Sequence, residues 1–433
     1  MTLPRKPKLL IVAGVWPHVR GNREAANVVA HEIASHLAAE ALFEVGYCVV
    51  GAEAQLPASA GLPELDALRG RGLRFFDPIA VGPMPSLKPG LLPKLATVLA
   101  GRPDRLLHGV DQHEGLSTVV SQWQPDAVLT IWSELGGNMV GQLPVVRFNY
   151  AGNPEYKVFG ARAELERRLP STGPLRSAYL HVLEPLVKAA HLQAMRRFDL
   201  VWDVAANDAR EYKRHGVEAK YLQNMWPGAI LDGWEARRDA SEQVSPLRIV
   251  GNVGNISATG NSFGFITLAE QILPRLVDRL GQGNFEIDLF GGGMPHPSVA
   301  PLLEDSHIRL RGFVPDLDAE ILAAPIFLVA NNHHRFKVGH TRFLHAWSLG
   351  ACVVAFADSA EAMPEIRHGE NALLAGTPHE MVDLIVRAGA DRDLRRRIGA
   401  GGVATLQSAF SPATVVERIS SDIRAVMQLE HMP

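Results

Sequence analysis

Cysteine is scarce in this sequence: its 433 residues include only Cys48 and Cys352, and each lies in an apolar, strand-like run. Two cysteines so far apart favour buried free thiols in a reducing compartment, with a disulfide as the alternative. The cytoplasm is therefore the expected location.

Long hydrophobic runs and a strong net charge are absent as well. No stretch approaches the ~20 consecutive apolar residues that a transmembrane helix needs. The apolar run at residues 9–15 is short and lacks a small-residue cleavage site, so it predicts a buried first strand and not a signal peptide. A formal net charge of −3 gives no overall field that would attract nucleic acid or an anionic membrane. Any basic site must be local.

Two groups of cofactor motifs are also missing. The glycine turns do not follow the G-x-G-x-x-G spacing, and no acidic residue stands where it would indicate NAD, which disfavours a dehydrogenase. No acidic D-x-D pair directly follows a predicted strand, and no H-x-x-x-H pattern lies on a helix. His333 and His334 are clustered, but no acidic residue is near them in the sequence. We therefore expect neither a metal nor a cofactor.

Apolar runs typical of strands alternate with helical patterns almost from end to end, which predicts βαβ units and mostly parallel sheets. The length suits two domains better than one core. Residues 234–246 are polar without an apolar period and predict a linker. We expect an α/β protein with two doubly wound domains, at 1–240 and 241–412, and a C-terminal helical segment at 413–433. The predicted strands lie at 9–15, 47–51, 127–132, 145–150, 199–204, 247–253, 285–290, 307–313, 326–330 and 351–356.

Glycines follow several of the predicted strands. In doubly wound sheets ligands lie beyond the carboxyl ends of the strands, where glycine lets backbone N–H groups approach a phosphate. A strand-to-helix turn also needs glycine for its own geometry, so each turn alone is a weak indication. The candidate turns contain Gly14 with Gly21, Gly251 with Gly254, Gly291 to Gly293, and Gly312.

The segment 331–342 gathers six basic or imidazole side chains between a predicted strand and a predicted helix. Cations at a helix N-terminus oppose the helix dipole, so their presence there favours an anionic ligand, and a diphosphate fits best. A solvated basic loop is the alternative. The residues expected to contact phosphate are Arg335, Lys337, His340, Thr341 and Arg342.

Several segments between about residues 195 and 410 together resemble the retaining GT-B glycosyltransferases of family four. Residues 287–293 (Ile-Asp-Leu-Phe-Gly-Gly-Gly) resemble the family's glycine strand, and 311–315 (Arg-Gly-Phe-Val-Pro) its G-f-V strand. Residues 345–354 stand where the family has E-A-m-A-x-G-x-P-V-V, and 365–374 match E-i-x-x-G-e-N-G-l-L. Residues 198–224 resemble the segment that closes the N-terminal domain.

The resemblance implies a GT-B fold, with two Rossmann-like domains facing a central cleft. It also implies transfer of a sugar from a UDP- or GDP-sugar to a glycan or lipid-linked acceptor, as in polysaccharide biosynthesis. In the family this transfer retains the anomeric configuration and needs no metal. The last helix of the family crosses back to the N-terminal domain, as we expect for residues 413–428. The proline-rich segment 81–103 is a candidate acceptor loop in contact with the inner membrane surface, or else an ordinary connection.

The resemblance also assigns site residues, with departures from the family pattern. Lys337 and His345 stand where the family has two glutamates, and Asn149 stands near its N-terminal-domain histidine, so these are the catalytic candidates. Gly254 and Asn255 stand where a phosphate-binding arginine is usual. The remaining donor-binding candidates are Gly14, Gly21, Gly291, Gly292, Phe313, Val314, Arg335, His340, Thr341, Arg342, Glu361 and Glu365.

These departures leave two other functions open. A catalytically degenerate GT-B protein would keep the fold and use it for binding or assembly. A GT-B sugar-nucleotide epimerase would need acidic residues that are missing here.

Overall fold

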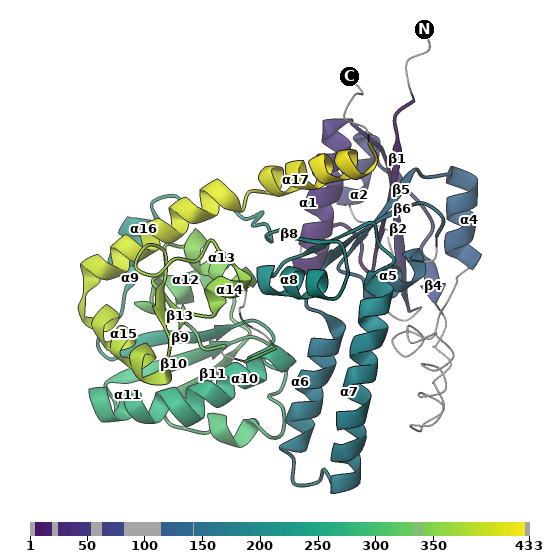
Figure 1. The fold of residues 1–433 in the computed structure, drawn as a ribbon. Coiled ribbons are helices and arrows are strands. Elements are labelled where there is room, and N and C mark those ends of the chain that lie inside the picture. The colour runs from purple at the N-terminus through teal and green to yellow at the C-terminus, as the bar shows by residue number, and fades with distance from the viewer. Residues whose placement is uncertain are drawn as a thin grey trace. The chain divides into compact units, whose positions relative to one another are not determined.

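A computed structural model describes residues 5–19, 25–52, 63–81, 114–141, 143–331, 333–335, 337 and 340–428. Its contacts divide the chain into two compact units, each built on a parallel sheet (Figure 1). Unit 1 comprises residues 1–159, 178–227 and 412–433, and unit 2 comprises residues 160–177 and 228–411. The alternation of strand and helix patterns thus correctly predicted a two-part α/β protein.

The described part of unit 1 contains an eight-stranded sheet in the order β3-β2-β1-β5-β6-β7-β8, with β4 paired to β2. Its strands are apolar, as is typical of parallel sheets whose faces are covered by helices. The strands are β1 Lys8–Ala13, β2 Glu44–Ala52, β3 Arg74–Phe75, β4 Ile79–Val81, β5 Ala127–Ile131, β6 Val146–Ala151, β7 Leu200–Asp203 and β8 Ala219–Tyr221. The helices that contribute to unit 1 are α1 Ala25–Glu40, α2 Pro63–Gly70, α4 Glu114–Trp123, α5 Glu134–Val140, α6 Glu155–Arg167, α7 Pro174–Met195, α8 Ala206–Arg214 and α17 Pro412–Val426.

The C-terminal helix α17 is part of unit 1, where it runs alongside α1 (Figure 1). Its apolar face is completely buried in the core of that unit, through Val415, Val416, Ile419 and Ile423. On its polar side, the Asp422 carboxylate accepts a hydrogen bond from Trp202 Nε1 at 2.7 Å. The helix therefore completes a core whose other residues come from the first half of the chain.

Deleting residues 412–433 is expected to destabilise unit 1 severely. Burial of one aliphatic side chain stabilises a fold by about 1.5–3 kcal/mol, and α17 buries four of them completely. The melting temperature of the truncated protein measures the effect. Glu417→Ala, on the exposed face of the same helix, is the control and should melt like wild type. Unchanged melting of the truncated protein would show that the helix is dispensable.

The described part of unit 2 contains a six-stranded parallel sheet in the order β11-β10-β9-β12-β13-β14. The chain starts in the middle with β9, builds outward to β10 and β11, and then returns to the other side of β9 with β12. The direction of winding therefore reverses between β9 and β12, which is where open α/β sheets bind ligands. The strands are β9 Leu247–Val253, β10 Phe285–Phe290, β11 Ile308–Gly312, β12 Ile326–Val329, β13 Val353–Phe356 and β14 Leu373–Ala375. The helices are α9 Trp234–Ser241, α10 Thr259–Thr267, α11 Leu273–Leu280, α12 Leu317–Leu322, α13 His340–Ser348, α14 Ser359–Ala362, α15 Pro378–Ala390 and α16 Arg392–Ala409, with a π-helical turn at Leu268–Ile272 and a 3-10 turn at Ala300–Leu303.

The linker expected at 234–246 is wrong over its first eight residues, which form the helix α9 of unit 2. The Trp234 ring packs closely on Gly350: a Cβ on Gly350 would lie 2.0 Å from the nearest ring atom. Arg238 is buried and donates hydrogen bonds to the backbone oxygens of Ile321 and Ala324. An arginine that is buried against carbonyl oxygens adds nothing to an apolar helical pattern in the sequence. The sequence of this segment therefore did not indicate a packed helix.

Two further features concern membrane-spanning helices and the cysteines. None of the described helices has the length and the apolar character needed to span a bilayer. Cys48 and Cys352 are buried free thiols, as the sequence predicted. Residues 82–113 lie outside the described part of the chain, and with them nearly all of the candidate acceptor loop 81–103.

Candidate functional site

The turns that follow β9 and β10 lie against each other at the carboxyl edge of the unit 2 sheet. Gly254 N donates to the Phe290 carbonyl at 3.0 Å, and Ile256 N donates to the Gly292 carbonyl at 2.9 Å. Gly291 has φ +135°, and a Cβ on it would lie 1.7 Å from the Gly254 carbonyl oxygen. Only glycine fits there. Gly254, Asn255 and Gly292 are exposed and form one backbone surface.

The turn after β11 joins the same surface. Gly291 N donates to the Gly312 carbonyl at 2.8 Å. Phe313, the next residue, has 73% of its surface exposed, and Val314 is partly buried. An exposed aromatic ring beside glycine turns offers a flat apolar face next to backbone donors.

Arg342 lies in the first turn of α13, at the point where the sheet changes direction. Its Nη1 donates to Asn252 Oδ1 at 3.1 Å and to Asn331 Oδ1 at 3.3 Å, and its Nη2 donates to Asn261 Oδ1 at 2.5 Å. Asn252 is on β9 and Asn331 follows β12, so they come from the two strands that flank the reversal. We call Asn252, Asn261 and Asn331 the amide cage.

The guanidinium in the amide cage keeps its charge. Burial lowers the pKa of Arg342 to about 10, which still leaves it protonated at neutral pH. No ion pair joins it to a carboxylate of the described residues. A protonated guanidinium that has no counter-ion among the described residues is suited to bind an anion at this edge.

Lys337 has a partner of its own. Its Nζ lies 3.2 Å from Asp358 Oδ2, in the turn between β13 and α14. Burial raises the pKa of Asp358, and the Lys337 ammonium opposes that rise. Glu361 is exposed on α14, and Glu365 lies partly buried just beyond it. Lys337 is therefore placed beside the segment that carries both glutamates.

The histidines of the basic segment have an acidic neighbour that sequence spacing could not show. His333 Nε2 lies 3.1 Å from Glu164 Oε2, and Arg335 Nε lies 3.9 Å from the same oxygen. Arg335 N donates to His333 Nδ1 at 3.3 Å, so the ring proton is on Nε2 and points to Glu164. Burial lowers the pKa of His333. Arg335 is thus held to a carboxylate.

Glu164, His333 and His334 also bring their ligand atoms within 4.8 Å of one another, close enough to hold a metal ion. The expectation of no metal depended partly on the lack of a nearby acidic residue, and that part of the reasoning was wrong. In the structure both nitrogens of the His333 ring already have hydrogen-bond partners within the protein. Within the group, His333 is therefore hydrogen-bonded to Glu164.

Three more predicted site residues are on α13, the helix of Arg342. His345 Nε2 is 2.7 Å from Asp318 Oδ1 on α12. His340 begins α13 and Thr341 is exposed in its first turn, but the His340 side chain is not among the described ones. Gly21 is outside the described residues.

Two of the predicted residues that the structure describes belong to unit 1. Gly14 follows β1, and a Cβ on it would lie 3.6 Å from Ser133 Oγ after β5. Asn149 is buried in β6, where its Oδ1 accepts from Thr130 Oγ1 at 2.7 Å and its Nδ2 contacts Met195 Sδ at 3.2 Å. Its amide is thus engaged inside the core.

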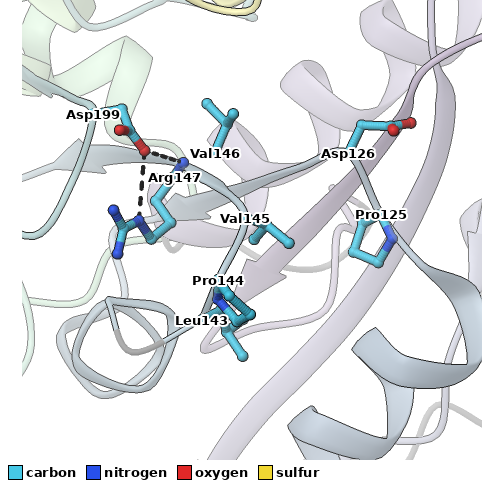
Figure 2. Close-up of a pocket in the computed structure, with 8 residues that line it drawn as sticks. All are labelled: Pro125, Asp126, Leu143, Pro144, Val145, Val146, Arg147 and Asp199. Carbon is cyan, nitrogen blue, oxygen red and sulfur yellow. Dashed lines mark hydrogen bonds and ion pairs between the residues drawn. The ribbon is translucent and has the colours of Figure 1, made fainter.

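A cavity of about 550 Å³ in unit 1 lies at the amino ends of β5, β6 and β7 (Figure 2). Its acidic residues are already paired: Asp199 accepts from Arg147 N at 2.8 Å, and Asp126 pairs with Arg5 at 2.8 Å. Ligands of doubly wound sheets bind at the carboxyl edge of the sheet. This cavity is at the amino edge, so it is not the candidate site. It is lined by Pro125, Asp126, Leu143, Pro144, Val145, Val146, Arg147 and Asp199.

Residues 248–391 match the family model described as Glycosyl transferases group 1. No curated protein matches the chain in sequence. Sucrose-phosphate synthase from Thermosynechococcus elongatus is similar in structure, with a TM-score of 0.61 and 14% identity over 98% of this chain and 100% of that one. HepE of Anabaena in complex with UDP has a TM-score of 0.56 and 14% identity over 96% and 100% of the two chains. A glycosyltransferase from Rickettsia africae has a TM-score of 0.56 and 11% identity over 99% and 100%.

The two parallel-sheet units together with these structural likenesses define the GT-B fold. The family match begins at the second residue of β9 and covers the rest of the unit 2 sheet, including both glycine turns and Arg342. The domain match and the fold together support a glycosyltransferase of the GT-B type.

Proposed function

We propose that this chain transfers a sugar from a nucleoside-diphosphate donor to a glycan or lipid-linked acceptor, with retention of the anomeric configuration. The observation that carries the proposal is the protonated Arg342, which no described carboxylate pairs, at the reversal point of the unit 2 sheet. A diphosphate supplies the missing negative charge. UDP is the first candidate, because the solved structures of HepE contain UDP or UDP-glucose; GDP is the second.

The surrounding groups suit the remaining parts of such a donor. The exposed backbone of Gly254, Asn255 and Gly292 provides N–H groups and a close approach to phosphate. Phe313 offers a flat face for a base. In the reaction, charge develops on the departing diphosphate, and a fixed guanidinium stabilises that charge without moving. Lys337, Glu361 and Glu365 are the candidates for contacts to the sugar.

Calorimetric titration with UDP, GDP, uridine and guanosine tests the donor. We expect one diphosphate to bind, and the matching nucleoside to bind much more weakly. A screen of nucleotide sugars, read by mass spectrometry of the products, then identifies the sugar. Absence of affinity for every nucleotide would favour the degenerate GT-B protein.

Turnover is expected to continue in excess EDTA, because Arg342 supplies the positive charge that metal-dependent enzymes take from an ion. Initial rates with and without EDTA, followed by addition of Mn²⁺, measure this. Loss of turnover that Mn²⁺ restores would contradict the proposal. In that case His333→Gln would show whether Glu164, His333 and His334 hold the ion.

A further inference from the structure

Arg342 differs from the buried arginines of unit 2 in the kind of partner it has. Arg238 and Arg395 both contact the Glu242 carboxylate, at 3.3 and 2.8 Å, and Arg248 contacts Asp288 at 2.7 Å. Arg342 instead faces three amide oxygens. An amide oxygen satisfies an N–H group but carries no net charge, so it orients the guanidinium without neutralising it.

The amide cage is held by the glycine turns themselves. Asn261 Nδ2 donates to the Asn255 carbonyl at 2.6 Å, and Asn252 Nδ2 donates to the Phe290 carbonyl at 3.4 Å. These bonds fix which end of each amide faces the arginine, because an NH₂ group is bound on the other side. The two carbonyls belong to the residues beside Gly254 and Gly291, so the cage ties the guanidinium to the surface that would receive phosphate.

Asn331 is fixed by packing. A Cβ on Gly264 of α10 would lie 2.8 Å from Asn331 Oδ1, so glycine leaves room for this amide. All three cage side chains are buried, with exposures of 1% for Asn252, 6% for Asn261 and 5% for Asn331. Three buried side chains from different elements thus converge on one cation, which is a built site.

We propose that Asn252, Asn261 and Asn331 are positioning residues that hold Arg342 in place while leaving its charge free for the diphosphate of the donor. This inference rests on the proposed function for the identity of the ligand. It assigns a role to the neutrality of the cage. An aspartate at any of the three positions would still accept a hydrogen bond from Arg342, but its negative charge would neutralise the guanidinium.

Asn261→Asp in the full chain tests the proposal, with pyrophosphate, UDP and uridine as calorimetric probes. The new carboxylate would stand 2.5 Å from Arg342 Nη2. We expect the affinity for pyrophosphate and UDP to fall by about tenfold or more, and the affinity for uridine to stay the same. Asn252→Asp should lower the same affinities, because Asn252 accepts from Nη1 of the guanidinium. Asn284→Asp, exposed before β10, adds the same charge far from the cage and should change nothing.

A purely structural cage predicts the opposite order of effects. It would lose more binding in Asn261→Leu, which removes both the acceptor for Arg342 and the donor to the Asn255 carbonyl, than in Asn261→Asp, which removes only that donor. Equal pyrophosphate affinity in wild type and in both aspartate variants overturns the inference. If wild type binds pyrophosphate but no nucleotide, and Asn261→Asp abolishes that binding, the cage stands and the proposed donor is wrong. A ligand-free double-mutant cycle of Asn261→Asp with Arg342→Gln gives a second readout, since the aspartate should lower the melting temperature less when Arg342 is present than when glutamine replaces it.

Discussion

Replacing Arg342 with alanine is expected to weaken UDP binding by about ten- to a hundredfold while uridine binding changes little. A charge-assisted hydrogen bond to phosphate contributes roughly 1.5–3 kcal/mol. Uridine has no phosphate, so its binding does not depend on this bond. Calorimetry with the two ligands measures the difference. Arg342→Lys should restore only part of the affinity, because an ammonium cannot present the paired donors of a guanidinium.

The same substitution also has a structural effect that the sequence did not lead us to expect. Removing the guanidinium leaves the oxygens of Asn252, Asn261 and Asn331 buried without their donor. Each buried acceptor left unsatisfied costs about 1–3 kcal/mol. The alanine variant should therefore melt at a lower temperature than wild type. Normal UDP affinity in a variant that remains folded would show that the donor binds elsewhere.

The glycine turns and the helix start at this edge could be predicted from the sequence because they are local features. Strand runs followed by glycine identified the turns at Gly254 and Gly291, and the basic segment identified Arg342 at the start of a helix. Parallel strands place all their carboxyl ends on one edge, so residues after different strands had to meet. That rule needs no knowledge of which strands are neighbours.

The partners of these residues depended on strand order, which the sequence does not show. Asn252 and Asn331 meet at Arg342 because β9 and β12 are adjacent, although 78 residues of chain separate them. Likewise Glu164 reaches His333 only because residues 160–177 pack on unit 2. Asparagines and single glutamates have no periodicity that would mark them, and their roles depend on contacts that form only on folding.

The degenerate GT-B alternative relied on the loss of the family's charged pairs. The structure weakens that argument in physical terms, because the edge retains a protonated and oriented cation, which is costly to keep without a use. A carboxylate in the cage would neutralise Arg342, and none of the three positions carries one. The neutral cage therefore favours a protein that still binds an anion.

Gly291→Ala is expected to disrupt both the stability of unit 2 and donor binding. The added Cβ would lie 1.7 Å from the Gly254 carbonyl oxygen, and the φ of +135° is one that alanine strongly disfavours. The two glycine turns must separate, which moves the backbone of Gly254 and, through the Asn255 carbonyl, the Asn261 side chain that faces Arg342. We expect a loss of several kcal/mol in the free energy of unfolding, about 1–3 kcal/mol of it from backbone strain alone. UDP affinity should fall with it.

Gly292→Ala is the matched control, because a Cβ at the neighbouring position meets nothing within 4 Å. Its melting temperature should equal that of wild type, whereas Gly291→Ala should melt much lower. Titration of both variants with UDP below their melting temperatures separates stability from binding. If Gly291→Ala melts and binds UDP like wild type, the turns do not touch as described and the donor surface is not formed by them.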